Sequence, residues 1–211
     1  MTTQRRQKLS GVYAITDAAL TPAQSMRGQV EQALQGGVRI VQYRDKSADS
    51  KRRLEQAREL VSLCRAYEAL LIVNDDVELV EAIDADGVHV GREDAALSEA
   101  RARLGDERII GVSCYDSLER AERAVAGRAD YIAFGSFFAS SIKPHAVRPP
   151  VSLLAEASQR WSIPLCAIGG INAGNAATLI AGGADMLAVI SALFGGADPR
   201  AAARELCDLF P

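Results

Sequence analysis

The chain alternates short apolar runs with longer stretches in which apolar and polar residues recur at helical spacing. The short runs are almost continuously apolar, which is typical of parallel strands that are buried on both faces. Between them, amphipathic stretches such as 23–37 and 50–69 place apolar residues near a 3.6-residue period and predict helices. The predicted strands are 12–16, 39–44, 70–74, 87–90, 108–113, 131–135, 164–170 and 186–191.

The residues that end the predicted helices and precede the predicted strands support a repeated strand–helix unit. The glycine pairs Gly36-Gly37 and Gly182-Gly183 are typical of helix ends. A small residue followed by Asp also precedes three of the predicted strands, which is a weak internal repeat. The three copies are Ala85-Asp86, Ala129-Asp130 and Ala184-Asp185.

Eight strand–helix units in one chain predict an α/β fold, a single (β/α)8 TIM barrel with eight parallel strands. The alternative is a doubly wound open sheet, but no GxGxxG motif follows the first predicted strand. The length of 211 residues suits one barrel domain, and no composition break divides it. We expect residues 1–10 to be a flexible leader without the apolar core of a signal peptide, and 11–211 to be a single catalytic domain.

Polar residues concentrate where the predicted strands end, which is the side on which a barrel carries its active site. Gln42, Arg44 and Lys46 alternate along one strand and therefore share a direction. An amide can read the edge of a heterocycle, and the two cations suit phosphate oxygens, so they predict a phosphorylated heterocyclic ligand. Taken alone, the segment also fits a strand that runs out into a charged loop. Further polar residues at other strand ends are Asn74, Asp75, Asp94, Ser113, Ser140, Ser141, Lys143 and Ser191.

Two acidic residues at neighbouring strand ends form a candidate metal site. Asp75 and Asp94 follow the third and fourth predicted strands. Each of them alone fits the N-cap of the next helix. Mg²⁺ is usually held by one or two carboxylates together with substrate phosphates. The two carboxylates, at the same end of the barrel as the cations Arg44, Lys46 and Lys143, therefore predict a magnesium site.

The last two predicted strands end in a pattern that suits phosphate binding. Gly169-Gly170 follows the seventh strand and Ser191 follows the eighth, where barrels commonly bind phosphate. Glycine lets backbone N–H groups approach a phosphate closely. A tight turn explains the glycine pair equally well. The long segment 137–150 after the sixth strand fits either a lid or a plain surface loop.

Composition excludes several other functions. The net charge of −3 gives no reason to expect nucleic acid as a partner, and no apolar run has transmembrane length, so a cytoplasmic location is the default. The four cysteines have no CxxC spacing, which argues against a zinc site or disulfides and predicts reduced core thiols. We expect His89 to lie in the barrel interior with a hydrogen bond, and His145 to be exposed. The sequence shows no Ser-His-Asp order and no setting for a nucleophilic cysteine, so it does not predict covalent catalysis.

Taken in order, these residues resemble the thiamine-phosphate synthase family from Gly11 to Phe210. Single motifs are loose, but the ordered set is specific. The matching segments are Gln42-Tyr43-Arg44-Asp45-Lys46, Asn74-Asp75, Ala85 to Asp94, Gly111 to Ser113, Asp130 to Gly135, Lys143, Ile168 to Ile171 and Ala188 to Ser191.

The resemblance implies a transferase of thiamine biosynthesis that joins a hydroxymethylpyrimidine diphosphate to a thiazole phosphate and releases pyrophosphate with Mg²⁺. The implied mechanism is dissociative and needs no protein nucleophile. Asp75 and Asp94 would hold Mg²⁺, and Arg44, Lys46, Ser113 and Lys143 would be the catalytic residues. The pyrimidine diphosphate would be bound by Gln42, Arg44, Lys46, Asn74, Ser113 and Lys143, and the thiazole phosphate by Ser140, Ser141, Ile142, Gly170, Ile190 and Ser191.

One segment departs from the family pattern. The family commonly shows Thr-x-Thr-Lys after the sixth strand, whereas this chain has Ser140-Ser141-Ile142-Lys143. The missing hydroxyl at Ile142 is expected to weaken thiazole phosphate binding by about 0.5–1.5 kcal/mol unless backbone N–H groups compensate.

Three other functions remain as alternatives on the same fold. A thiazole tautomerase-like paralogue would isomerise one ring without joining two, and the retained Asp75, Asp94, Lys46 and Lys143 favour the synthase over it. A non-catalytic ligand-binding barrel is indicated by Ile142 alone. A phosphosugar epimerase or aldolase would need a carboxylate pair or a Schiff-base lysine within the strands. The expected partners are small-molecule substrates, with a homodimer as one candidate assembly.

Overall fold

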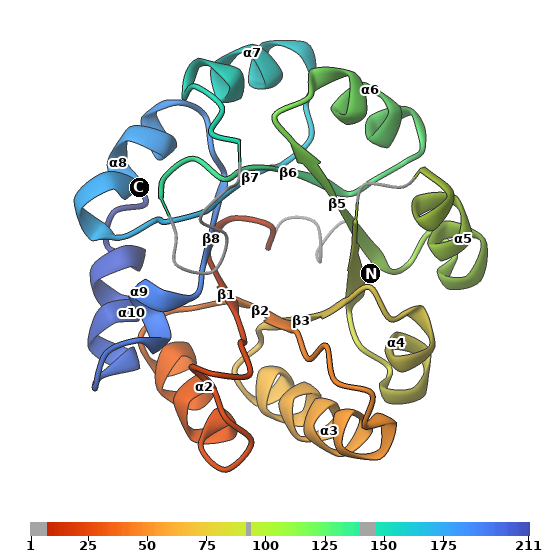
Figure 1. The fold of residues 1–211 in the computed structure, drawn as a ribbon, viewed down its shortest axis with the longest axis vertical. Coiled ribbons are helices and arrows are strands. Elements are labelled where there is room, and N and C mark those ends of the chain that lie inside the picture. The colour runs from red at the N-terminus through yellow and green to blue at the C-terminus, as the bar shows by residue number, and fades with distance from the viewer. Residues whose placement is uncertain (1–7, 92–93, 140–146) are drawn as a thin grey trace.

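The computed structural model is a closed barrel of eight parallel strands surrounded by helices (Figure 1). It describes residues 8–91, 94–139 and 147–211, with the backbone alone for Asp94 and Ala95. The strands follow each other around the barrel in chain order, and the last pairs with the first. The predicted fold class is confirmed. The strands are β1 (Gly11–Ile15), β2 (Ile40–Tyr43), β3 (Leu70–Asn74), β4 (Gly87–Val90), β5 (Ile109–Tyr115), β6 (Tyr131–Gly135), β7 (Leu165–Ile168) and β8 (Met186–Val189).

Helices cover the outside of the barrel and return the chain to the start of each strand (Figure 1). Where α2 ends, the chain passes close to α10, and a Cβ atom on Gly36 would lie 2.4 Å from the carbonyl oxygen of Arg200. Only glycine permits this approach, which closes the helical ring. The helices are α2 (Met26–Gln35), α3 (Ser50–Ala66), α4 (Val77–Ile83), α5 (Asp94–Leu104), α6 (Leu118–Ala126), α7 (Ser152–Arg160), α8 (Ala173–Ala181), α9 (Ser191–Phe194) and α10 (Pro199–Cys207).

Two buried layers hold the barrel together. The larger lies between the strands and the helices, and the smaller fills the barrel interior with side chains such as Ile40, Ile72 and Met186. Leu9 belongs to the interior layer and is only 3% exposed. The packed part of the chain therefore includes Leu9, which lies within the predicted flexible leader 1–10. Residues 1–7 lie outside the described part of the chain.

The repeated Asp before the strands has a structural role. Asp86, Asp130 and Asp185 each accept a hydrogen bond at a carboxylate oxygen from the backbone N–H of a neighbouring strand, at 2.8–2.9 Å. Each also donates its own backbone N–H to the carbonyl of that same residue, at 2.8–3.0 Å. The repeat therefore fixes strand register at the N-terminal ends of the strands, the side of a barrel that serves stability.

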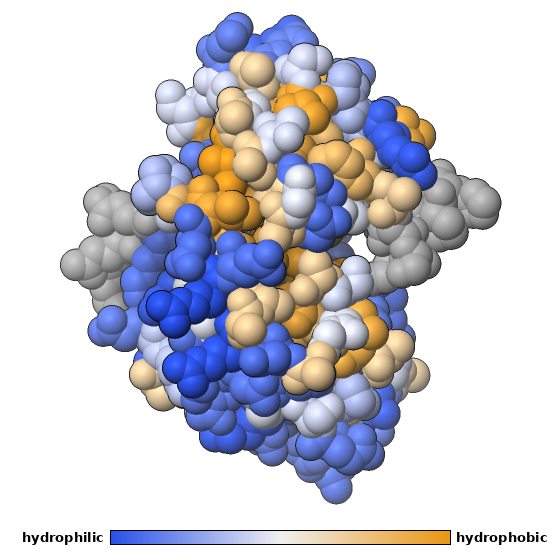
Figure 2. All heavy atoms as spheres, turned by 90° about the vertical axis from the view of Figure 1, so that its left-hand side faces the viewer, coloured by the Kyte–Doolittle hydropathy of each residue, from blue (hydrophilic) through white to orange (hydrophobic). Residues whose placement is uncertain are grey.

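Figure 2 shows the face of the molecule on which α8 to α10 lie, with apolar surface gathered in its upper half. The sequence of α8, AGNAATLIA, contains no charged residue.

In the described part of the chain, no helix is long and apolar enough to cross a membrane. Cys64, Cys114 and Cys166 are buried free thiols, and burial raises the pKa of Cys64 and of Cys166 to about 12.

Candidate active site

The C-terminal ends of the strands form one rim of the barrel, called the mouth here, and two cavities open from it. The first has a volume of about 110 Å³ and is lined by Gln42, Arg44, Asn74 and His89 together with residues of β1. The second has a volume of about 140 Å³ and is lined by the ends of β5 to β8. The two cavities share five residues, and that shared wall joins them. These residues are Ser113, Ala133, Ile168, Ala188 and Ile190.

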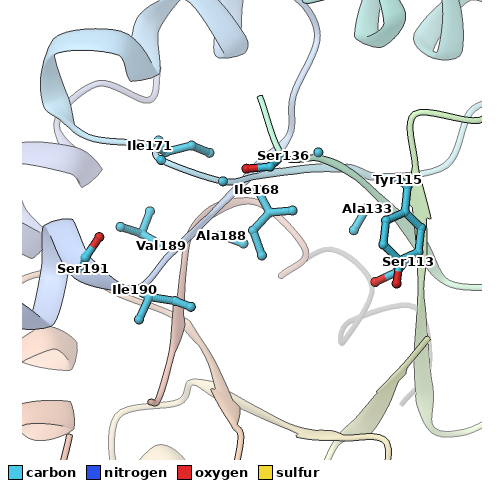
Figure 3. Close-up of a pocket in the computed structure, with 13 residues that line it drawn as sticks. Ser113, Tyr115, Ala133, Ser136, Ile168, Ile171, Ala188, Val189, Ile190 and Ser191 are labelled. Carbon is cyan, nitrogen blue, oxygen red and sulfur yellow. The ribbon is translucent and has the colours of Figure 1, made fainter. Parts of the chain in front are cut away.

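Figure 3 shows how the second cavity is built. The apolar side chains of Ile168 on β7, Ala188 on β8 and Ile190 just beyond β8 point inward. The hydroxyls of Ser113 and Tyr115 lie opposite them. The register of β5 against β6 shifts between Ser113 and Tyr115, so both side chains reach the same cavity. Such bulges often redirect side chains next to active sites. The result is a slot with an apolar middle, with the hydroxyls of Ser113 and Tyr115 at one end and that of Ser191 at the other.

The predicted cation positions after β2 differ in their surroundings. Arg44 is held at the mouth because its backbone N–H donates to the Thr16 hydroxyl at 2.9 Å. Its guanidinium lies 3.6 Å from the carboxylate of Asp17, and both side chains are about one-fifth exposed, at 22% and 18%. Lys46 is exposed on the loop beyond β2. Arg44 therefore faces the first cavity, whereas Lys46 lies further out.

Asp75 lies at the mouth in a distinctive backbone conformation. It has a φ of +63°, and its N–H donates to the carbonyl of His89 at 2.9 Å, which fixes it beside β4. The amide of Asn74 donates to one of its carboxylate oxygens at 2.6 Å. Asp75 does not cap α4; that role belongs to Asp76, which accepts from the N–H of Leu79. The carboxylate of Asp75 is thus left exposed to a ligand at the mouth.

Asp94 begins α5, directly beyond β4, but its side chain lies outside the described residues. The part of the chain whose side chains are described contains no cluster of three or more His, Cys, Asp or Glu residues that could hold a metal ion. A metal at this position would need further ligands from substrate or water, which is the usual arrangement for Mg²⁺.

A chain of hydrogen bonds crosses the barrel interior between Gln42 and Ser113. The Gln42 amide donates to the Tyr13 hydroxyl at 2.9 Å, and that hydroxyl lies 2.8 Å from the hydroxyl of Tyr131. His89 contacts Tyr131 through Nδ1 and Ser113 through Nε2, both at 2.9 Å. The predicted interior position of His89 is confirmed. Burial raises the pKa of both tyrosines, so they keep their protons.

The glycine pair after β7 is required by a close backbone approach. Gly169 and Gly170 have φ values of +106° and +64°. A Cβ atom on Gly170 would lie 2.3 Å from the carbonyl oxygen of Ala139. The N–H groups of Phe137 and Phe138 donate to the carbonyls of Ile168 and Gly169, both at 3.0 Å. The chain after β6 thus lies directly on the end of β7, and its Ser136 lines the second cavity.

The structure brings most of the predicted site residues that it describes to one mouth. Gln42, Arg44, Asn74 and Ser113 line the first cavity, and Gly170, Ile190 and Ser191 line the second. The predicted residues after β6 lie outside the described part of the chain, as does His145. These residues are Ser140, Ser141, Ile142 and Lys143.

Several residues of the site had no predicted role from the sequence. Tyr13 and Tyr131 lie within apolar strands, and only their inward alternation could have indicated an interior position. Tyr115 lay beyond the predicted end of its strand at 113, and the bulge explains why the strand continues. Ser136 lines the second cavity and donates to the carbonyl of Phe138 at 3.0 Å. A lone serine after a strand gave no signal.

Comparison with known proteins gives a consistent result over the whole chain. The model of a family described as thiamine monophosphate synthase matches residues 12–193. A thiamine-phosphate synthase of Thioalkalivibrio sulfidiphilus is 50% identical over 208 residues, which cover 99% of each chain. One from Thiobacillus denitrificans is 54% identical over 201 residues, covering 95% of this chain and 94% of the relative.

A solved structure agrees with the sequence relatives. Thiamine phosphate pyrophosphorylase from Pyrococcus furiosus is 38% identical, with a TM-score of 0.86, and the match covers 97% of this chain and 96% of that one. The chain therefore belongs to the thiamine monophosphate synthase family, and its activity is that of a thiamine-phosphate synthase, a transferase of thiamine biosynthesis.

Proposed function

We propose that the two cavities hold the two substrates of this synthesis and that the new bond forms at their shared wall. The substrates are 4-amino-2-methyl-5-hydroxymethylpyrimidine diphosphate and 4-methyl-5-(2-phosphoethyl)thiazole. The products are thiamine phosphate and pyrophosphate. The observation that carries the proposal is the pair of cavities joined at Ser113, Ala133, Ile168, Ala188 and Ile190.

The first cavity suits the pyrimidine diphosphate. Gln42 and Asn74 supply amide groups that can read the ring edge, and Arg44 supplies a cation for the diphosphate. Lys46 and Lys143 are assigned to the same diphosphate by family position. The ion pair of Arg44 with Asp17 is loose, at 3.6 Å, so the guanidinium can turn toward an anionic ligand. Ser113 closes this cavity on the side of the second one.

The second cavity suits the thiazole phosphate. Its apolar wall of Ile168, Ala188 and Ile190 matches an apolar ring. Gly170 and Ser191 lie after β7 and β8, the position of the common phosphate site of barrels. Ser140, Ser141 and Ile142 are assigned to the same phosphate by family position.

Mg²⁺ is the metal that the available groups fit. Asp75 offers an exposed, hard oxygen ligand at the mouth, oriented by Asn74, and Asp94 follows the neighbouring strand. With the diphosphate and water completing its coordination, two carboxylates are the expected protein share. When bound, Mg²⁺ would neutralise charge on the departing pyrophosphate.

The chemistry requires positioning and charge stabilisation rather than a protein nucleophile. The bond from the methylene carbon to the diphosphate oxygen breaks, and its electron pair leaves with pyrophosphate while the pyrimidine amino group donates electron density. The lone pair of the thiazole nitrogen then forms the new carbon–nitrogen bond. Arg44, Lys46 and Lys143 stabilise the departing charge, and Ser113 donates a hydrogen bond at the shared wall.

The remaining assignments follow from this reaction. We place the enzyme in the cytoplasm, because both substrates are phosphorylated metabolites that do not cross membranes unaided. We assign residues 11–211 to one catalytic domain, beneath which Leu9 also packs, since β1 to β8 all contribute to the two cavities. Small molecules are its partners, and a homodimer is the proposed assembly.

An assay of both products tests the reaction. The purified chain is incubated with both substrates and Mg²⁺, and thiamine phosphate and pyrophosphate are quantified. We expect them in equal amounts and only when both substrates are present. A tautomerase-like enzyme would convert a thiazole isomer without consuming the pyrimidine diphosphate, and a non-catalytic barrel would form neither product; each of these results would contradict the proposal.

A further inference from the structure

Five side chains from five different strands form one continuous hydrogen-bonded chain through the barrel. Gln42, Tyr13, Tyr131, His89 and Ser113 are linked by four contacts of 2.8–2.9 Å. Both ends of the chain, Gln42 and Ser113, line the first cavity, so a ligand there can touch both.

The direction of donation along this chain is the same at every link. A tyrosine hydroxyl has one proton to donate, and a neutral imidazole has one donor and one acceptor nitrogen. The hydroxyls of Tyr13 and Tyr131 belong to side chains that are 1% and 0% exposed, so each must donate inside the protein. A change of direction at one link therefore leaves a buried hydrogen-bonding group unpaired elsewhere.

The orientation of the Gln42 amide sets that direction. Its N–H donates to Tyr13, so Tyr13 donates to Tyr131, and Tyr131 donates to Nδ1 of His89. The proton of His89 then lies on Nε2, which donates to the Ser113 oxygen. Three groups remain for a ligand in the first cavity: the carbonyl oxygen of Gln42 as an acceptor, the second N–H of the same amide as a donor, and the hydroxyl proton of Ser113 as a donor.

We propose that Tyr13, Tyr131 and His89 are positioning residues that couple the amide orientation of Gln42 to the hydroxyl direction of Ser113. In this direction the cavity selects a ligand that presents a donor to Gln42 and an acceptor to Ser113. An aminopyrimidine with an anionic leaving group has this pattern, so the proposal rests on the proposed function. If the carbonyl oxygen of Gln42 faced Tyr13 instead, donor and acceptor would exchange roles in every hydrogen bond of the series. The site would then select a ligand that presents an acceptor to Gln42 and a donor to Ser113.

The tautomer of His89 reports the direction without any need for turnover. The chain contains two histidines, His89 and His145, so the His145→Gln variant leaves one imidazole signal. In ¹⁵N-resolved NMR at neutral pH, we expect the proton of His89 on Nε2 in the free protein. A proton on Nδ1, or rapid averaging between the two tautomers, would overturn the assigned direction even if the enzyme is active.

Two tyrosine variants then separate coupling from loss of a buried hydroxyl. Tyr131→Phe removes the central link, whereas Tyr43→Phe removes the hydroxyl of another buried tyrosine, which donates to Gln56 at 2.8 Å and takes no part in this series of hydrogen bonds. We expect Tyr131→Phe to mix the His89 tautomers and to lower kcat/KM for the pyrimidine diphosphate about 10- to 100-fold. We expect Tyr43→Phe to change neither.

The folded state of each variant is checked by circular dichroism, and Tyr13→Phe replaces Tyr131→Phe if the latter does not fold. The KM for the thiazole phosphate is expected to stay the same in both variants. Of the five hydrogen-bonded residues, Ser113 alone lines the second cavity. Equal effects of Tyr131→Phe and Tyr43→Phe on the tautomer and on kcat/KM would overturn the coupling. If wild-type protein makes no thiamine phosphate, the proposed function fails, and the NMR measurement still decides the direction of the chain.

Discussion

Asp75 is the single residue whose local geometry bears most directly on metal binding. It is held with a positive φ of +63°, its backbone N–H bonds to β4, and its carboxylate is oriented by Asn74 at 2.6 Å. The cap of α4 is formed by Asp76, so a helix-capping role does not explain Asp75. A residue kept in a rarely populated backbone region, whose side chain caps no helix, is a candidate for function.

We predict that Asp75→Asn lowers kcat about 10²- to 10³-fold, because removing one preorganised electrostatic group typically has that effect. The Mg²⁺ concentration for half-maximal rate should rise as well. Steady-state kinetics over a magnesium titration checks both values. Asp116→Asn is the matched control, since Asp116 is also exposed beyond a strand end but has no assigned role. Near-normal turnover of Asp75→Asn would remove Asp75 from the metal site.

The Asp residues before the strands show how an ion pair supports one strand boundary. Asp130 accepts from the N–H of Ile110 at 2.8 Å and from Arg101 at 2.7 Å. The side chains of Arg101 and Asp130 are only 10% and 1% exposed. Breaking such a buried pair leaves an uncompensated charge in the protein interior.

We predict that Asp130→Ala lowers the free energy of unfolding by about 3–5 kcal/mol. Asp106→Ala is its control, because Asp106 pairs with Arg128 at a surface where both side chains are more than 60% exposed, and such pairs contribute about 0–1 kcal/mol. Urea denaturation of both variants measures the difference. Equal losses would show that burial of the pair is not what stabilises this strand boundary.

The loop after β6 and the glycine pair after β7 form one packed unit. Gly170 requires a side-chain-free position both by its φ of +64° and by the carbonyl oxygen of Ala139. Gly105 has nearly the same φ, +62°, but no atom within 4 Å of its Cβ position. The two glycines therefore separate backbone strain from loss of space.

We predict that Gly170→Ala raises the KM for thiazole phosphate at least about 10-fold, because the loop must move away from the second cavity. Gly105→Ala should share the strain but leave both KM values unchanged. Kinetics with each substrate varied in turn checks this. An unchanged thiazole phosphate KM in Gly170→Ala would contradict the placement of that substrate.

Periodicity predicted the elements well, because continuous apolar runs between amphipathic stretches are typical of parallel strands that alternate with helices. The ends of strands were less accurate. The predicted strand 164–170 ends at Ile168, where Gly169 turns the backbone, and the predicted strand 108–113 continues to Tyr115 through a bulge. Such ends depend on tertiary contacts that a linear pattern does not contain.

For the molecule as a whole, the sequence predicted which end of the barrel carries the site but not how the site is divided. Strand ends such as Gln42 and Gly170 could be assigned to the mouth from order alone. The two cavities and the interior chain through Tyr13 and Tyr131 could not, because both depend on side chains that meet across the barrel. An apolar strand pattern does not distinguish a core tyrosine from a hydrogen-bonding one.

Burial of two thiols predicts that the free energy of unfolding of the whole molecule falls at alkaline pH. The pKa values of Cys64 and Cys166 are raised by burial from 9.0 to about 12. Between these values the unfolded chain loses the thiol protons and the native chain keeps them, so stability falls as pH rises. Each thiol contributes a slope of up to about 1.4 kcal/mol per pH unit.

We therefore expect the free energy of unfolding to be nearly independent of these thiols below about pH 8 and to fall above pH 9. Cys166→Ala should make the alkaline slope shallower, whereas Cys207→Ala should change it less, because Cys207 is only partly buried. Denaturation at several pH values measures the slopes. A slope that Cys166→Ala leaves unchanged would contradict the buried-thiol origin of this fall in stability.

The central claim is that two substrates meet where the two cavities share a wall. A crystal structure with thiamine phosphate and pyrophosphate bound tests it most directly. We predict the pyrimidine ring beside Gln42 and Asn74, the thiazole phosphate beside Gly170 and Ser191, and the methylene bridge between Ser113 and Ala188. Both rings in one cavity, or a product bound away from this wall, would contradict the claim.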